Sequence, residues 1–110
     1  MNVNDYLEIR DLFQTKWDPA VLEVLAERPY RFLALVRRVR VTVDNEILDG
    51  TVARSLDRLQ ELRYVDTRPV PAGDRDVLVY ALTDRGINTL TAYQAIIAAY
   101  RQVRAECESA

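Results

Sequence analysis

The sequence contains no histidine and only one cysteine, Cys107. It therefore cannot form an internal disulfide, a Cys/His zinc site or a histidine-based catalytic pair. Its carboxylates are scattered at surface spacing, with no Gly-rich phosphate loop and no paired-acid motif to organise them. These absences argue against an enzyme, and no metal or cofactor is expected.

Glycine, proline and long hydrophobic runs are also scarce. With 3 Gly, 4 Pro, 49% hydrophobic and 29% charged residues, the composition is that of a globular, helix-rich protein. No stretch approaches the roughly 18 apolar residues of a membrane span, and the first residues lack a signal-peptide pattern. We expect a cytoplasmic protein without membrane contact, in which residues 1–110 form a single domain.

Charge is unevenly distributed along the chain. The whole sequence has 15 basic and 17 acidic residues, and its formal net charge is −2. The segment 28–68, however, holds nine arginines and six acids and carries +3, whereas the rest carries −5. A positive segment within an acidic chain is what a face directed at phosphates would need.

The segment 49–62 has the pattern of an amphipathic helix. Val52, Leu56 and Leu59 recur at helical spacing and predict one buried face. Four residues outside that stripe are predicted to reach a DNA groove: Thr51, Arg54, Ser55 and Arg58. The segments 63–68 and 77–83 follow as a predicted two-stranded ribbon. The fold class is thus mainly α with a small β-ribbon, in the order of a winged helix-turn-helix with its core over 16–82.

Other helices are expected on the N-terminal side. The segment 3–13 is amphipathic, and Asp18-Pro19 is a strong start signal because Asp accepts from free N–H groups and Pro needs no donor. Residues 31–38 predict the first helix of the helix-turn-helix. The connection from residue 39 to 48 would then be unusually long.

The segment 84–107 predicts a long C-terminal helix that Thr83 can cap. Its apolar residues recur at intervals of three or four, close to the repeat of helices that wrap around each other. We therefore expect a homodimer through this helix and the N-terminal one. The predicted interface residues are Tyr6, Ile9, Phe13, Leu90, Tyr93, Ile97 and Tyr100.

Several landmarks between residues 16 and 86 occur in a recognisable order. They are Lys16-Trp17, Val21-Leu22 with Leu25, Arg31-Phe32 with Leu35, Leu56 and Leu59 before Tyr64-Val65, and Tyr80-Ala-Leu-Thr-Asp-Arg-Gly86. In this order they resemble the HxlR-type winged-helix transcriptional regulators, relatives of the MarR group.

The resemblance implies a dimeric bacterial repressor or activator that binds double-stranded DNA in a sequence-specific manner. The helix at 49–62 would enter the major groove. The wing at 69–76 would lie near the backbone or the minor groove, with Arg68 and Arg75 facing phosphates. The two reading helices of the dimer would lie roughly 34 Å apart and read an inverted-repeat operator.

Two features depart from the family pattern. Arg63 stands where the family usually has Gly, and Arg lacks the freedom of Gly at positive φ. Asp44, Glu46 and Asp49 lie where a phosphate-facing turn is expected. Many redox-sensing members of this family carry a reactive cysteine near the N-terminus. No cysteine precedes Cys107 in this sequence, so a thiol switch of that kind is not expected.

Three alternatives stay open at this point. Arg54 and Arg58 also fit a solvated helix face, paired with acids such as Asp57 or Glu61. The acidic balance also fits a winged-helix protein-interaction module, or an atypical regulator without conventional DNA binding. Finally, helices near a dimer seam often line a pocket for a small-molecule effector.

Overall fold

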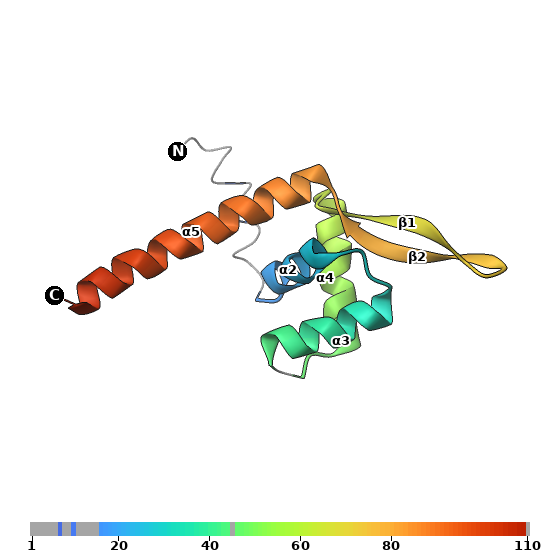
Figure 1. Cartoon of the computed structure of the whole chain (residues 1–110), viewed down its shortest axis with the longest axis horizontal. Coiled ribbons are helices and arrows are strands. Elements are labelled where there is room, and N and C mark those ends of the chain that lie inside the picture. The colour runs from blue at the N-terminus through green and yellow to red at the C-terminus, as the bar shows by residue number, and fades with distance from the viewer. Residues whose placement is uncertain (1–6, 8–9, 11–15, 45, 110) are drawn as a thin grey trace.

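The chain folds into a small helical body with a β-ribbon at one end and a long helix at the other (Figure 1). The structure is a computed structural model and describes residues 7, 10, 16–44 and 46–109. Its elements are α2 (Asp18–Glu27), α3 (Phe32–Val43), α4 (Asp49–Glu61), β1 (Val65–Ala72), β2 (Arg75–Leu82) and α5 (Asp84–Ser109). This arrangement is a winged helix-turn-helix, as predicted, with α3 and α4 as the helix pair and the ribbon as the wing.

Most of the helix predicted over 3–13 lies outside the described residues, and so do Tyr6, Ile9 and Phe13. Within the described part of the chain, no helix is both long and apolar enough to cross a membrane.

The core lies where α2, α3 and α4 meet. Each helix contributes apolar side chains at helical spacing, and the fully buried ones include Leu22, Leu35, Val39, Leu56 and Leu59. Tyr64, at the start of the ribbon, is also fully buried, and Trp17 packs against the edge of this cluster. This packing fixes the orientation of α4 against α2, with the C-terminal end of α4 next to the base of the ribbon.

The start of α2 differs from the prediction. Trp17 occupies the N-cap position, and its side chain makes no capping hydrogen bond. Asp18 is only 2% exposed. Its carboxylate instead accepts hydrogen bonds from Ser55 and Arg58 of α4. A buried carboxylate is better satisfied by a hydroxyl and a guanidinium than by one backbone N–H group.

The helix α3 is longer, and the turn after it shorter, than the sequence pattern indicated. The helix continues through Val43, so residues 44–48 alone connect it to α4. Val39 is fully buried, and this packing overrides the lower helix propensity of the β-branched residues that follow it. Asp44 ends the helix in the left-handed conformation, with a φ of 50°. The predicted long connection over 39–48 is therefore wrong.

The ribbon is an antiparallel hairpin anchored at its base. Its strands pair from Val65 and Leu82 at the base to Ala72 and Arg75 at the tip. Gly73, with a φ of 69°, opens the two-residue turn, as a type II′ hairpin requires. At the base, Tyr30 and Tyr80 exchange two backbone hydrogen bonds of 3.0 and 2.7 Å. These bonds hold the wing against the connection between α2 and α3.

The end of α4 and the start of α5 are joined across the base of the ribbon. Arg63 adopts a left-handed conformation, with a φ of 65°, at the position where the family pattern has Gly. The Thr83 hydroxyl donates to the Arg63 carbonyl at 2.7 Å and accepts from the Gly86 N–H at 3.0 Å, which confirms the predicted cap. A Cβ on Gly86 would lie 2.1 Å from the Tyr64 carbonyl oxygen. The Thr-x-x-Gly pattern is therefore required by close backbone packing.

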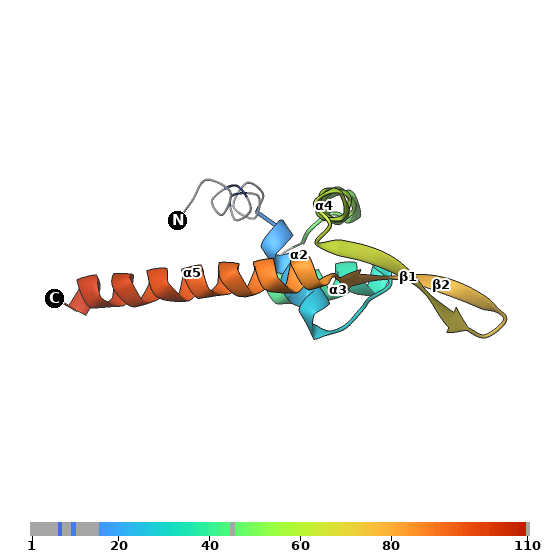
Figure 2. The same ribbon diagram turned by 90° about the horizontal axis from the view of Figure 1, so that it is seen from above.

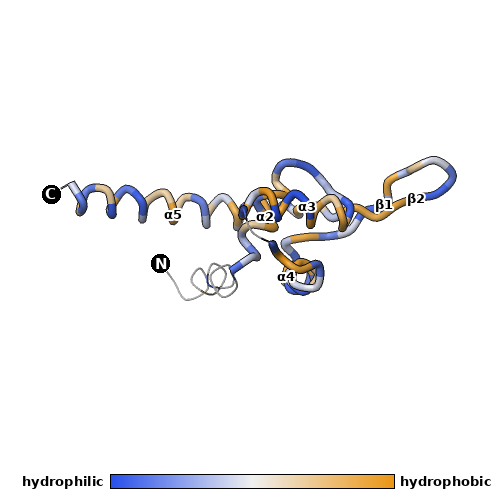
Figure 3. Tube along the Cα trace, turned by 90° about the horizontal axis from the view of Figure 1, so that it is seen from below, coloured by the Kyte–Doolittle hydropathy of each residue, from blue (hydrophilic) through white to orange (hydrophobic). Residues whose placement is uncertain are grey.

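The helix α5 leaves the body after its first turns (Figure 2). Gly86 and Leu90 are its buried residues, and Tyr93 packs partly against the core. Apolar residues nevertheless recur along its outer length among hydrophilic ones (Figure 3). Tyr100 and Val103, for example, are 60% and 58% exposed. The outer part of α5 thus carries an apolar stripe that the described protomer does not cover.

Candidate nucleic-acid interface

The outward face of α4 begins at its N-terminal end. Arg54 is exposed, and its Nη2 lies 3.4 Å from the Thr51 hydroxyl oxygen, a long hydrogen bond. A Cβ on Gly50 would lie 3.6 Å from Arg54 Nη1. The Arg54 guanidinium therefore lies along the first turn of the helix, beside Gly50 and Thr51. The structure brings Thr51 and Arg54 together on one accessible surface.

The acid next to this surface is neutralised within the protein. Arg40 Nη2 donates to Asp49 Oδ1 at 2.9 Å, and Arg40 Nε donates to the Ile47 carbonyl oxygen, also at 2.9 Å. One arginine thus holds the residues on both sides of Leu48. Asp49 was one of three acids that the sequence placed near a phosphate-facing turn, and its charge is balanced here. Asp44 and Glu46 are exposed in the turn itself.

Ser55 is not on the outward face, contrary to the prediction. Its side chain is fully buried, and its hydroxyl donates to Asp18 Oδ1 at 2.5 Å. Its position, three residues after Val52 and next to Leu56, lies beside the buried stripe of the helix. The periodicity of α4 is compatible with either orientation for a small polar residue. The deciding partner is 37 residues away in the sequence, so the local pattern contains no sign of it.

Arg58 connects α4 to α2. Its Nε donates to Asp18 Oδ2 at 3.2 Å and its Nη2 donates to Asp18 Oδ1 at 2.8 Å. The hydrogen bond to Asp18 raises the pKa of Arg58 above its ordinary value, although burial opposes this effect. The partner is therefore Asp18, and not the nearby acids Asp57 or Glu61 that the sequence allowed. The Arg58 side chain is still 40% exposed, so one edge of it faces solvent.

The two arginines of the ribbon lie at different heights. Arg75 is exposed and pairs in register with Ala72 beside the turn at the tip. Arg68 lies farther down, in register with Val79. Its Nη2 donates to the Leu82 carbonyl oxygen at 3.4 Å, and its Nε lies 3.5 Å from Asp66 Oδ1. Of the two, Arg75 alone is brought to the wing tip.

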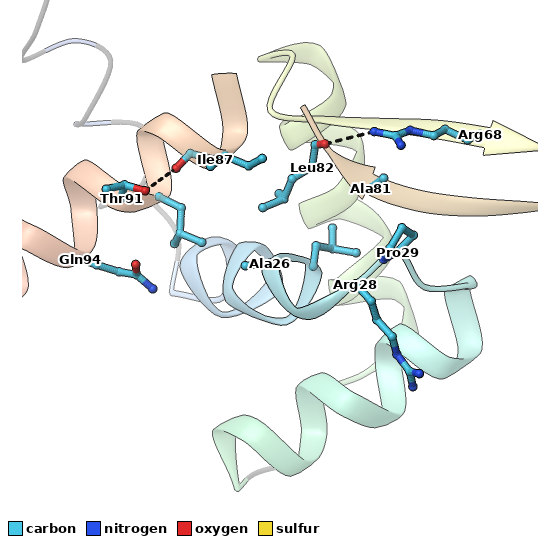
Figure 4. A pocket seen from close by; sticks show the side chains of 11 residues that line it. Ala26, Arg28, Pro29, Arg68, Ala81, Leu82, Ile87, Thr91 and Gln94 are labelled. Carbon is cyan, nitrogen blue, oxygen red and sulfur yellow. Dashed lines mark hydrogen bonds between the residues drawn. The ribbon is translucent and has the colours of Figure 1, made fainter. Parts of the chain in front are cut away.

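A pocket opens beside Arg68, between α2, β2 and α5 (Figure 4). Its volume is about 360 Å³. Apolar side chains form most of its wall, and the polar groups at its edge come from Arg68, Thr91 and Gln94. Arg28 also lines this pocket, and its side chain extends toward α3 (Figure 4). None of the described lining residues is acidic.

The predicted dimer residues on α5 divide into two groups. Leu90 is 4% exposed and belongs to the core of its own protomer, so it offers almost no surface to a second copy. It follows Gly86 by one turn, where α5 still packs against α2 and β2. Tyr93 and Ile97 are half-buried, and Tyr100 is 60% exposed. The accessible stripe therefore begins near Tyr93 and continues outward.

Two further polar features lie on other elements than α4. Arg38 forms two hydrogen bonds with Glu27, of 3.0 and 2.9 Å, and this interaction lowers the pKa of Glu27. Cys107 is exposed near the end of α5. Among the residues that the structure describes, no three His, Cys, Asp or Glu side chains form a group that could hold a metal ion.

No protein-family model matches the sequence, and no curated protein is significantly similar to it. Solved structures do share its fold. The diamide-treated form of the transcriptional regulator YodB from B. subtilis is 22% identical, with a TM-score of 0.71 over 93% of this chain and 94% of that chain.

Two further structures give similar agreement. A PadR family transcription regulator from Clostridium difficile is 16% identical, with a TM-score of 0.68 over 83% of this chain and 97% of that chain. A structure described as the complex of hsRosR-S1 is 25% identical, with a TM-score of 0.68 over 93% of this chain and 92% of that chain. The likeness covers 83–93% of this chain and 92–97% of the matched chains, and it establishes the winged helix-turn-helix fold.

Proposed function

We propose that the protein is a sequence-specific, DNA-binding transcriptional regulator that acts in the cytoplasm as a homodimer on an inverted-repeat operator. The observation that carries this proposal is the N-terminal face of α4. There Thr51 and the exposed Arg54 lie together, and the neighbouring Asp49 is neutralised by Arg40. In helix-turn-helix proteins the N-terminal residues of the second helix contact base edges in the major groove.

The proposed contacts divide by role. Thr51 and Arg54 would face bases, because both are accessible at the start of α4. Arg58 would offer its exposed edge to a nearby phosphate while Asp18 holds its inner edge. Arg75 at the wing tip, and Arg68 with a side chain 56% exposed, would face the backbone. Ser55 has no contact in this scheme because it is buried.

A titration with two arginine variants tests this division of roles. The probe is a fluorescent duplex selected by the wild-type protein from a randomised pool, compared with a shuffled duplex of the same composition. We expect Arg54→Ala to lower the preference for the selected duplex by about 10- to 100-fold. Arg75→Ala should weaken binding to both duplexes alike. If Arg54→Ala leaves the preference unchanged, α4 is not the reading helix in the way proposed.

The sequence landmarks support placing the chain with the HxlR-type regulators. Tyr80-Ala-Leu-Thr83 and Gly86 form the joint between wing and α5, and Arg31-Phe32 begins α3. The structural likeness to YodB and to a PadR family regulator is consistent with a related winged-helix group. Both of these proteins are transcriptional regulators, which supports the regulatory role that we propose for this chain.

Dimerisation would use the outer part of α5. Tyr93, Ile97 and Tyr100 lie along one side of this helix, and Tyr100 and Val103 are more than half exposed. A stripe of this length on a projecting helix is covered most simply by the same helix of a second copy. The two α4 helices of such a dimer would then contact successive turns of the major groove.

The pocket beside α5 favours a ligand-responsive version of this function. Its volume of about 360 Å³ falls within the range of small-molecule sites, and its apolar wall ends at the Arg68 guanidinium. We propose an effector with an apolar body and a carboxylate, which would compete with DNA phosphate for Arg68. Calorimetry with 1-naphthoate should show binding that Ile87→Trp removes by filling the pocket. Equal binding to that variant would place the ligand elsewhere.

A further inference from the structure

We propose that Leu48 reads the C5-methyl group of a thymine in the operator. This inference rests on the proposed function and adds a specificity-determining residue to it. Leu48 precedes α4 as its N-cap residue and is 73% exposed, more than any other large hydrophobic residue of the described chain. The sequence pattern did not single it out, because the buried stripe of α4 begins at Val52.

The backbone around Leu48 is held from both sides. The guanidinium of Arg40 donates through Nε to the Ile47 carbonyl oxygen and through Nη2 to the Asp49 carboxylate, each at 2.9 Å. We call this pair of hydrogen bonds the Arg40 fork. The Leu48 carbonyl oxygen accepts from the N–H groups of Thr51 at 3.0 Å and Val52 at 3.2 Å. Ile47, one residue earlier, is 3% exposed and anchors the segment in the core. Leu48 therefore stands outward on a fixed backbone.

An exposed leucine alone is common and carries little information. What distinguishes Leu48 is its location, since it begins the helical turn that carries Thr51 and against which the Arg54 guanidinium lies. The polar side chains of Thr51 and Arg54 can form hydrogen bonds with base edges, whereas the Leu48 side chain can make only apolar contacts. The one apolar group that a base pair presents in the major groove is the thymine methyl group. Burial of that methyl against a fixed side chain favours thymine over the other bases.

The experiment removes the methyl group and the leucine separately. A duplex selected from a randomised pool by the wild-type protein is resynthesised with each thymine in turn replaced by deoxyuridine, which lacks only the C5-methyl. We expect one thymine per half-site at which wild type loses about fourfold in affinity, the value of one buried methyl group. In Leu48→Ala that fourfold difference should disappear. Leu48→Met, which keeps an apolar side chain of similar reach, should retain it.

Leu33→Ala is the matched control, because Leu33 is 59% exposed at the start of α3. This variant should keep the full thymine preference, and thermal unfolding should confirm that all three variants are folded. The inference is overturned if no thymine is sensitive to methyl removal, or if Leu48→Ala shows the same sensitivity as wild type. In that case selective binding of the wild-type protein would leave the proposed function standing. Failure of wild type to enrich any sequence would overturn both.

Discussion

Asp18 is the residue that connects α4 to the rest of the body. Its carboxylate is 2% exposed and receives one hydrogen bond from Ser55 and two from Arg58. Hydrogen bonds of a charged pair are stronger than neutral ones, and a buried carboxylate without partners would be costly. The same three residues therefore set the rotation of α4 about α2 and the position of the Arg58 guanidinium.

Replacing Asp18 with Asn tests this anchor. The amide has one acceptor oxygen in place of two and presents its own N–H groups to the donors of Arg58 and Ser55. We expect the free energy of unfolding to fall by about 2 to 3 kcal/mol, as measured by urea denaturation. The matched control is Glu27→Gln, which removes the exposed pair with Arg38 and should cost far less. Equal losses in the two variants would show that the hydrogen bonds of Asp18 contribute no more to stability than an exposed ion pair does.

Two glycines on helices provide a second test at the residue scale. Gly86→Ala would place a Cβ 2.1 Å from the Tyr64 carbonyl oxygen, so the backbone there has to shift. Overpacking typically lowers the free energy of unfolding by about 1 to 3 kcal/mol, and a clash with a backbone atom should lie at the upper end of that range. Gly50→Ala is the control, since its Cβ would meet only Arg54 Nη1 at 3.6 Å. That change should be neutral or stabilising by up to about 1 kcal/mol. A well-tolerated Gly86→Ala would contradict the close packing of wing and α5.

At the scale of elements, the sequence pattern predicts most of the fold because the local rules and the packing agree. The stripe Val52, Leu56 and Leu59 marks α4 correctly, and the Thr83 cap marks the start of α5. The end of α3 is missed because burial of Val39 outweighs the weak helix propensity of the valines after it. Helix ends of this kind are decided by tertiary contacts that a local pattern does not contain.

The candidate site is predicted less completely than the fold, for a related reason. Periodicity identifies Thr51 and Arg54 as accessible, but it does not separate them from Ser55, which a distant carboxylate draws inward. The Arg40 fork and the exposure of Leu48 also depend on contacts between α3 and the start of α4. These pairings become visible only when the elements are packed together.

The outer part of α5 is the proposed dimerisation surface. Ile97→Asp introduces a charge into the centre of its apolar stripe, and burial of that charge between two helices would be strongly unfavourable. We expect sedimentation analysis to show a monomer whose helical content is unchanged by circular dichroism. Ala95→Asp is the control, because Ala95 lies on the opposite side of the helix and is exposed. A variant Ile97→Asp that stays dimeric would move the interface to another element.

At the scale of the whole molecule, both the charge distribution and the shape are suited to a dimer that binds DNA. The segment 28–68, which contains α3, α4 and the start of the ribbon, carries +3 within a chain of net charge −2. The helix α5 extends away from that body, so a second copy could pair with it without covering α4 (Figures 1 and 2). An acidic remainder disfavours non-specific attachment to nucleic acid. Binding should therefore depend strongly on the fit of α4 to its sequence.

The most direct test of the central claim is an anisotropy titration of the wild-type protein against the selected and the shuffled duplex across a salt series from 50 to 200 mM, the range over which phosphate contacts weaken measurably. We expect the selected duplex to bind at least about 1000-fold more tightly, and both affinities to fall steeply as salt rises. Weak binding that is equal for the two duplexes and insensitive to salt would contradict the claim that this winged helix reads DNA.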